Sequence, residues 1–157
     1  MAESSGQTTL FPQWRQAVKD FLSAGFSAGD VIPRVWLEEH FGMPALDEAK
    51  PLLPAAYNAR HFVWLRNLEA LRSELLERHQ IYLSTVIGEG YRIVPPSEQT
   101  AAAQDKFERE AKKSYRVAAN ALKNIRVSEL TDAERRENLD AIAKLSMMRG
   151  MQKTALE

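Results

Sequence analysis

The chain has 157 residues, of which 45% are apolar, a share typical of folded proteins that argues against disorder throughout. Its 21 basic and 21 acidic side chains cancel, so binding to nucleic acid or to an anionic membrane requires charges gathered on one surface. The absence of cysteine excludes disulfides, thiolate metal sites and cysteine nucleophiles. Because the start of the chain is polar and no apolar run is as long as a membrane span, we expect a soluble cytoplasmic protein that contacts no membrane.

Apolar residues at helical spacing, bounded by glycine and proline, predict the elements of the first half. Gly25 and Gly42 are placed to end two helices, and Pro33 stands in the first-turn position that proline tolerates. Further prolines predict a loop that extends to Ala56. The predicted order is a disordered lead at 1–9, a helix at 11–24, an extended piece at 30–32, a short helix at 33–41 and a long helix at 58–79.

The long helix at 58–79 has two faces. An arc of apolar side chains predicts its buried face: Trp64, Leu65, Leu68, Leu71, Leu75 and Leu76. The opposite arc is predicted to face solvent and carries Arg60, Phe62, Val63, Arg66, Asn67, Ala70 and Ser73. Two bulky apolar residues, Phe62 and Val63, on a solvent face make that face a candidate binding surface.

The segment "STVIGEGYRIV", Ser84–Val94, predicts a β-hairpin. Residues that favour strands flank a turn at 88–90, whose two glycines permit positive φ. We expect strands at 81–87 and 91–94, ended by two prolines. A two-stranded ribbon is marginal alone, so it must pack on the helices, and the extended piece at 30–32 can add a third strand.

After residue 97 the sequence predicts two helices that fold back on each other. Apolar residues from Phe107 to Ile125 are spaced 4, 4, 3, 4 and 3, which indicates a heptad-like seam on a helix of about 28 residues. Thr131 and Glu134 have the spacing of a capping box. This box begins a last helix, expected to end near Arg149, whose apolar residues are Leu139, Ile142, Leu145 and Met148.

The predicted order of helix, strand, helix, long helix and hairpin is the winged-helix plan, with the long helix for recognition and the hairpin as the wing. The segment "TVIGEGYRI", Thr85–Ile93, resembles the wing of response-regulator effector domains, and "LRSELL", Leu71–Leu76, is loosely similar to the end of their recognition helix. The resemblance implies a winged fold and DNA contact by Arg92. We therefore expect a mainly α protein with a small β-hairpin: a winged helix-turn-helix domain at 10–96, then a C-terminal helical hairpin at 97–157.

The first functional hypothesis is a duplex DNA-binding protein that regulates transcription. In a major groove, the long helix would offer Arg60, Arg66 and Asn67 to bases and phosphates, and Val63 to thymine methyl groups. The alternative interpretation of these residues is a solubilising surface, because Glu74 and Glu77 lie on the same arc.

A basic stripe on the first C-terminal helix is a second candidate DNA contact. It consists of Lys106, Arg109, Lys113, Arg116 and Lys123, in a stretch from Lys106 to Arg126 with seven basic and two acidic residues. Such a stripe can follow a phosphate backbone. The alternative is a solvated flank that pairs with acidic residues of the last helix, namely Glu129, Glu134, Glu137 and Asp140.

The second functional hypothesis is a winged-helix module that binds protein, such as a phage or mobile-element factor that docks on a host complex. Exposed Phe62 and Val63 favour it, as does Glu89, because a carboxylate at the wing tip opposes entry into a phosphate-lined groove. In either case we expect a homodimer through the C-terminal helices, with Tyr115 and Leu122 in its seam.

Catalytic and cofactor sites are not predicted. The three histidines lack metal-ligand spacing, and the Gly88-x-Gly90 pair lies in a hairpin without the helix start and lysine of a phosphate-binding loop. We therefore expect a protein that is not an enzyme and that binds no metal or cofactor.

Overall fold

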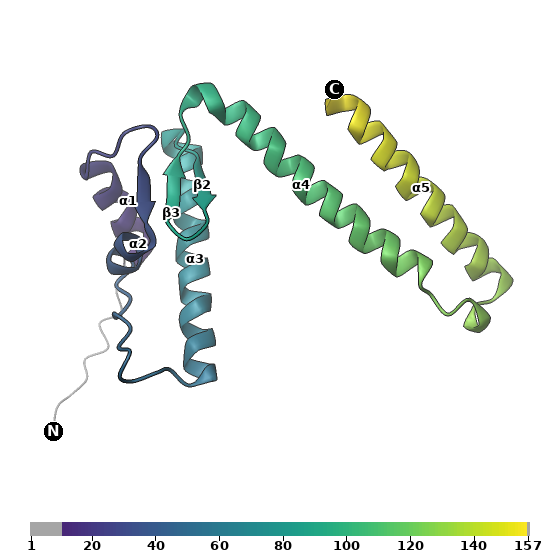
Figure 1. Cartoon of the computed structure of the whole chain (residues 1–157), viewed down its shortest axis with the longest axis horizontal. Coiled ribbons are helices and arrows are strands. Elements are labelled where there is room, and N and C mark those ends of the chain that lie inside the picture. Colours follow the sequence, from purple (N-terminus) through teal and green to yellow (C-terminus); the bar gives the residue numbers. More distant parts are fainter. Residues whose placement is uncertain (1–10, 157) are drawn as a thin grey trace. The chain divides into compact units, whose positions relative to one another are not determined.

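The computed structural model describes residues 11–156, which form two compact units that divide between Gln99 and Thr100 (Figure 1). The described chain is mainly helical, with five α-helices and one three-stranded antiparallel sheet. This confirms the expectation of a mainly α protein with a small β part, whereas the lead predicted at 1–9 lies outside the described residues. The first unit holds α1 (Gln13–Ser23), β1 (Val31–Pro33), α2 (Arg34–His40), α3 (Pro54–His79), β2 (Leu83–Val86) and β3 (Gly90–Ile93).

Glycine and proline set the helix boundaries of the first unit. Gly25 and Gly42, with φ of 74° and 67°, follow the ends of α1 and α2, as their positions in the sequence predict. The start predicted for α3 is wrong, because the helix begins at Pro54 and not at residue 58. The proline-rich pattern places Pro54 in a loop, but proline at the first helical position loses no hydrogen bond, since that N–H has no partner inside the helix.

The sheet has the strand order β1-β3-β2, with β3 in the centre. Its two pairings are antiparallel, with Leu83 opposite Ile93 and Val31 opposite Arg92. The strand bounds differ from those predicted: β2 is shorter, and Gly90, expected in the turn, pairs with both Val86 and Pro33 and so belongs to β3. The predicted third strand is present, and it ties the hairpin to the segment between α1 and α2.

One apolar core holds the first unit together. It lies between α1, α2, α3 and the sheet, and its fully buried side chains include Ile32, Leu37, Leu71 and Leu75. Beside it is an aromatic cluster in which the rings of Phe21, Phe26 and Trp36 lie 5.1 to 6.2 Å apart. Such edge and tilted contacts stabilise by about 0.5–1.5 kcal/mol per pair beyond their burial. The core residues are Ala17, Val18, Phe21, Ile32, Leu37, Phe41, Met43, Trp64, Leu68, Leu71, Leu75, Leu83 and Ile93.

The buried face of α3 is rotated from the predicted one. Leu65 and Leu76, expected inside, are exposed, whereas Asn67, expected in solvent, is only 7% exposed. When hydrophobicity alone defines the buried arc of α3, the predicted arc is centred too close to Leu65. The buried residues of α3 instead centre on Leu71, on the side of Asn67.

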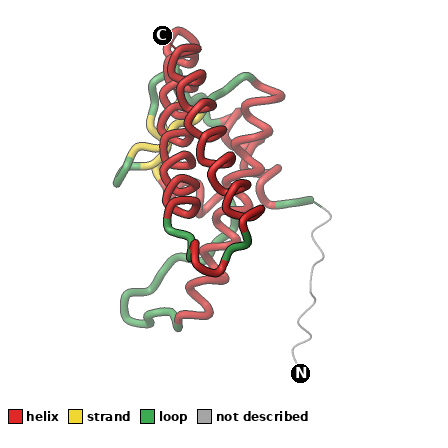
Figure 2. Tube along the Cα trace, turned by 90° about the vertical axis from the view of Figure 1, so that its right-hand side faces the viewer, coloured by secondary structure: helices red, strands yellow, loops and turns green. Residues whose placement is uncertain are grey.

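The second unit consists of α4 (Pro96–Lys123), whose first residues belong to the first unit, the short 3₁₀ segment η1 (Val127–Glu129) and α5 (Asp132–Leu156). Helices α4 and α5 run side by side in opposite directions (Figures 1 and 2), and Asn138 of α5 donates a hydrogen bond to the carbonyl of Leu122, 3.0 Å away. The capping box is confirmed: Thr131 N–H donates to Glu134 at 2.7 Å, and Glu134 N–H donates to Thr131 Oγ1 at 3.3 Å.

The second unit has no buried core of its own. From residue 100 to residue 155, no described side chain is buried, and the faces that α4 and α5 turn toward each other are only half-buried. The predicted end of the last helix near Arg149 is wrong, because α5 continues through Gly150 to Leu156. Its predicted apolar face is also partly wrong, since Leu139 and Met148 are exposed.

Candidate interaction site

Arg60, predicted to contact DNA, is used inside the protein. Its side chain is 14% exposed, its Nη1 donates to the carbonyl oxygen of Pro44 at 2.6 Å, and its Nη2 lies 3.8 Å from a carboxylate oxygen of Glu38. These contacts fasten the loop after α2 to α3. Because its side chain is largely covered and engaged in these contacts, the prediction that Arg60 lies on an open face is wrong.

The remaining predicted contacts on α3 do not form a basic surface. Asn67 is only 7% exposed, so little of its surface is open to a ligand. Val63 and Arg66 are exposed, and Arg66 is followed one turn later by the exposed carboxylate of Glu69. Phe62, by contrast, is 70% exposed, which makes it one of the most open large apolar side chains of the first unit.

The β2–β3 hairpin carries one arginine, and that arginine is paired. Arg92 Nη1 donates to Glu98 Oε2 at 2.8 Å. The hydrogen bond from Arg92 and its charge lower the pKa of Glu98, and the hydrogen bond with Glu98 raises the pKa of Arg92. The turn of this hairpin adds a carboxylate at Glu89 and an apolar side chain at Ile87, which is 96% exposed. The hairpin surface is therefore apolar and acidic at its tip.

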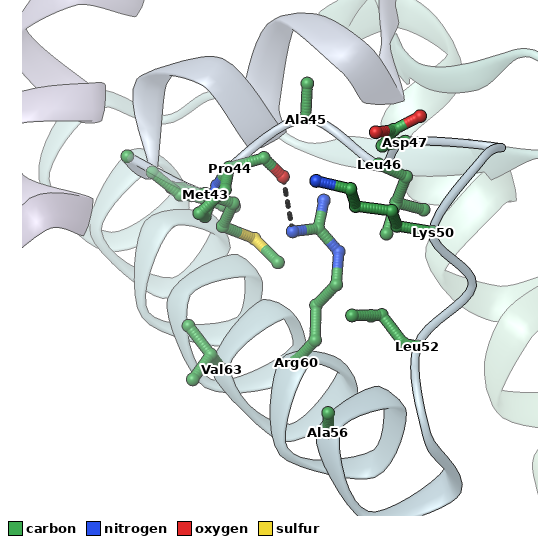
Figure 3. Close-up of a pocket in the computed structure, with 12 residues that line it drawn as sticks. Met43, Pro44, Ala45, Leu46, Asp47, Lys50, Leu52, Ala56, Arg60 and Val63 are labelled. Carbon is green, nitrogen blue, oxygen red and sulfur yellow. Dashed lines mark hydrogen bonds between the residues drawn. The ribbon is translucent and has the colours of Figure 1, made fainter.

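A pocket of about 400 Å³ lies between the N-terminal half of α3 and the loop after α2 (Figure 3). Figure 3 shows the side chains of Arg60, Lys50 and Leu52 pointing into it, with Val63 on the adjoining turn of α3. Its lining is mostly apolar, with the two cations and Asp47 as the charged groups: Phe41, Gly42, Met43, Pro44, Ala45, Leu46, Asp47, Lys50, Leu52, Ala56, Arg60 and Val63.

Exposed apolar side chains surround this pocket. Leu46 and Leu52 line it and are exposed, and Leu53 and Tyr57, next to it in the chain, are also exposed. Sequence reasoning missed this site, because a proline-rich stretch is typical of a simple connection. The available signal was the three leucines among those prolines, since connecting loops seldom place leucine in water without a use for it.

The predicted basic stripe on α4 is open. Lys106 is half-buried and lies 4.0 Å from Glu110, but Arg109, Lys113 and Arg116 are exposed and form no ion pair with a described residue. The alternative of pairing with acidic residues of the last helix is wrong for the described chain. Those carboxylates act locally: Glu129 pairs with Arg126, and Glu134 caps α5.

Tyr115 and Leu122, predicted to form a dimer seam, lie on the side of α4 that faces α5. Both are half-buried on one face of α4, where the carbonyl of Leu122 accepts the hydrogen bond from Asn138 of the same chain. This face is therefore turned toward α5 of the same chain, and the part of these two residues in a dimer stays a prediction.

No protein family, curated protein or solved structure matches this chain in the comparisons. Among residues 11–156, no group of three histidine, aspartate or glutamate side chains is arranged to hold a metal ion. In the same range, no helix combines the length and the apolar character that crossing a membrane requires.

Proposed function

We propose that the first unit is a winged-helix domain whose function is to bind another protein. The element order α1-β1-α2-α3-β2-β3 and the sheet order β1-β3-β2 support the winged-helix interpretation. In that interpretation α3 is the recognition helix, and the loop from β2 to β3 is the wing. The resemblance of Thr85–Ile93 to the wing of response-regulator effector domains agrees with it.

The pocket beside α3 carries the proposal. Its apolar lining, together with exposed Leu53 and Tyr57, gives a concave surface rimmed by large apolar side chains, which is typical of a protein-binding site. Lys50, which forms no ion pair with a described residue, adds positive charge to its lining, so a partner segment with an apolar side chain next to a carboxylate fits best. A phage or mobile-element factor that docks on a host complex would use such a module.

The same residues argue against DNA reading through α3. Arg60 is held by Pro44 and Glu38, Asn67 is buried and Arg92 is paired, which leaves Arg66 as the open cation among the predicted contacts of the first unit. Binding duplex DNA needs several phosphate contacts, because each neutralised phosphate adds affinity by releasing counterions.

An affinity experiment with matched variants tests the proposal. Val63→Asp places a charge on the pocket lining, and Leu22→Asp places one on a similarly exposed apolar site of α1. In calorimetry with purified components, we expect a protein partner to bind the wild type and Leu22→Asp with similar affinity. The same partner should bind Val63→Asp about tenfold more weakly, or not at all. Equal affinities of the purified partner for all three proteins would contradict the proposal.

A second candidate function is duplex DNA binding, and through it transcriptional regulation, by the outer face of α4. The specific observation in its favour is that Arg109, Lys113 and Arg116 are exposed and unpaired with any described residue. Roughly three to five phosphate contacts would give weak, salt-sensitive and sequence-independent binding.

A gel mobility shift with random duplex DNA at low salt tests the second candidate. We expect a shift that disappears as salt is raised and is absent in the triple variant R109E/K113E/R116E. The control is the double variant R60A/R66A, which leaves the stripe intact. The absence of a shift at the lowest salt would contradict DNA binding. Loss of the shift in R60A/R66A but not in R109E/K113E/R116E would show that the DNA contact lies on α3 instead.

A further inference from the structure

The pocket between α3 and the loop after α2 has the size of a small-molecule site. Its volume of about 400 Å³ lies in the range of about 300–1,000 Å³ that such sites occupy. All of its lining residues belong to the first unit, and apart from Asp47, Lys50 and Arg60 they are apolar. A mostly apolar pocket with a few charged groups at fixed places is the usual form of a site for a small organic ligand.

Two cations enter this apolar pocket, and one of them has no carboxylate partner. Figure 3 shows Lys50 and Arg60 pointing into it. Arg60 lies 3.8 Å from a carboxylate oxygen of Glu38, whereas Lys50 forms no ion pair with a described residue. The carboxylate of Asp47 accepts a hydrogen bond from the N–H of Ala49 at 2.9 Å. The ammonium group of Lys50 is therefore the charge in the lining that a bound anion would neutralise.

The loop that carries Lys50 is held by two contacts. The N–H of Lys50 donates to the carbonyl oxygen of Asp47 at 3.0 Å, which closes a turn, and Arg60 of α3 donates to the carbonyl oxygen of Pro44 at 2.6 Å. The backbone on both sides of the pocket is thus arranged before a ligand arrives, and a site arranged in advance loses less affinity to ordering.

We propose that this pocket binds a small apolar carboxylic acid. Its carboxylate meets the ammonium group of Lys50, and its hydrocarbon part lies against Met43, Leu52 and Val63. A carboxylate carries the single charge that one free cation neutralises. A phosphate group carries more charge and more oxygens, and an apolar lining leaves these without donors. The inference concerns the same pocket as the proposed function, but it requires no protein partner.

The methionine methyl groups give a readout at the site itself. Met43 lines the pocket and is 9% exposed, whereas Met147, Met148 and Met151 lie on α5. In nuclear magnetic resonance titration of the full-length protein, 4-phenylbutyrate should shift the Met43 signal saturably and leave the signals of the three α5 methionines in place. We expect a dissociation constant of about 1 mM or below. The neutral amide of the same acid should bind about tenfold more weakly.

Two substitutions of Lys50 test the role of its charge. Lys50→Met removes the charge and keeps the length of the side chain, whereas Lys50→Arg keeps the charge. Both alter an exposed position in a loop, outside the core. Lys50→Met should bind the acid as weakly as the amide, and Lys50→Arg should retain the preference for the acid.

Three results would overturn the inference. They are an unshifted Met43 signal at up to about 10 mM acid, equal affinity of the wild type for acid and amide, and an undiminished preference for the acid in Lys50→Met. Failure of this inference is distinguishable from failure of the proposed function. A protein that binds the acid but no protein partner contradicts the proposed function alone, and one that binds a partner but not the acid contradicts this inference alone.

Discussion

Gly90 in β3 lies directly against the main-chain carbonyl oxygen of Ile32 in β1. A Cβ at position 90 would overlap that oxygen, and the backbone there has a φ of +151°, which side chains seldom allow. Glycine is therefore required for the central strand to pair with both of its neighbours, and the β2–β3 hairpin depends on this contact for its attachment to β1.

Gly90→Ala is expected to lower the free energy of unfolding of the first unit by about 2–4 kcal/mol, because it combines backbone strain with a steric overlap. The matched control is Gly88→Ala in the same turn, where a Cβ meets nothing within 4 Å and only the positive φ is disfavoured. That variant should cost about 1–2 kcal/mol. If Gly90→Ala and Gly88→Ala lose the same free energy of unfolding in chemical denaturation, the overlap with Ile32 adds nothing to the cost of the substitution.

The stability of the first unit should fall at alkaline pH through Tyr91. Burial raises the pKa of Tyr91 above its ordinary 10.0, and the charges of Arg72 and Arg34 partly offset this. The folded state thus binds the phenolic proton more tightly than the unfolded state. The resulting stabilisation is complete below the ordinary value of 10.0 and is lost as the pH rises through the raised pKa.

Thermal unfolding across the alkaline range, compared between the wild type and Tyr91→Phe, measures this effect. The variant should show a flatter dependence on pH, because it has no phenolic proton to lose. An identical slope for both proteins would mean that Tyr91 titrates as it does in the unfolded chain.

Acid should release Arg92 from Glu98. Because the arginine lowers the pKa of Glu98, the pair stabilises the folded state above the ordinary glutamate value of 4.5, and this contribution is lost as the pH falls through the lowered pKa. Solvent reaches both groups, so the effect on stability is small. Nuclear magnetic resonance titration of the Glu98 carboxyl should give a midpoint below 4.5, which returns toward that value in Arg92→Gln.

The capping box at the start of α5 should hold the first turn of that helix. Thr131→Ala removes the bond to Glu134 N–H and is expected to destabilise the turn by about 1 kcal/mol. Hydrogen exchange of the amides that follow should accelerate about fivefold, whereas Ser114→Ala, at an exposed position inside α4, should change little. Unchanged exchange at 132–135 in Thr131→Ala would show that the cap contributes nothing measurable.

Local patterns in the sequence predicted the element order well. The two glycines after α1 and α2, the turn between β2 and β3 and the spacing of Thr131 and Glu134 each encode a backbone requirement that acts within a few residues. Boundaries failed where one residue type has two uses, as with Pro54, which begins a helix, and Gly150, which continues one.

The candidate site was harder to predict because exposure is a tertiary property. Arg60 and Asn67 have the residue types of a DNA-reading helix, but their positions relative to Pro44 and to the core decide what they contact. The pocket depends on the loop after α2 folding back over α3, and no periodic pattern encodes that. Phe62, Val63 and Arg66 were placed correctly in solvent, since their arc lies farther from the core.

All three tryptophans, Trp14, Trp36 and Trp64, lie in the first unit, and two of them pack in its core or its aromatic cluster. Their emission therefore reports on the first unit alone, whereas the helical circular dichroism also includes α4 and α5 of the second unit. If the two signals melt at different temperatures, the separate stabilities of the two units can be read from one unlabelled sample.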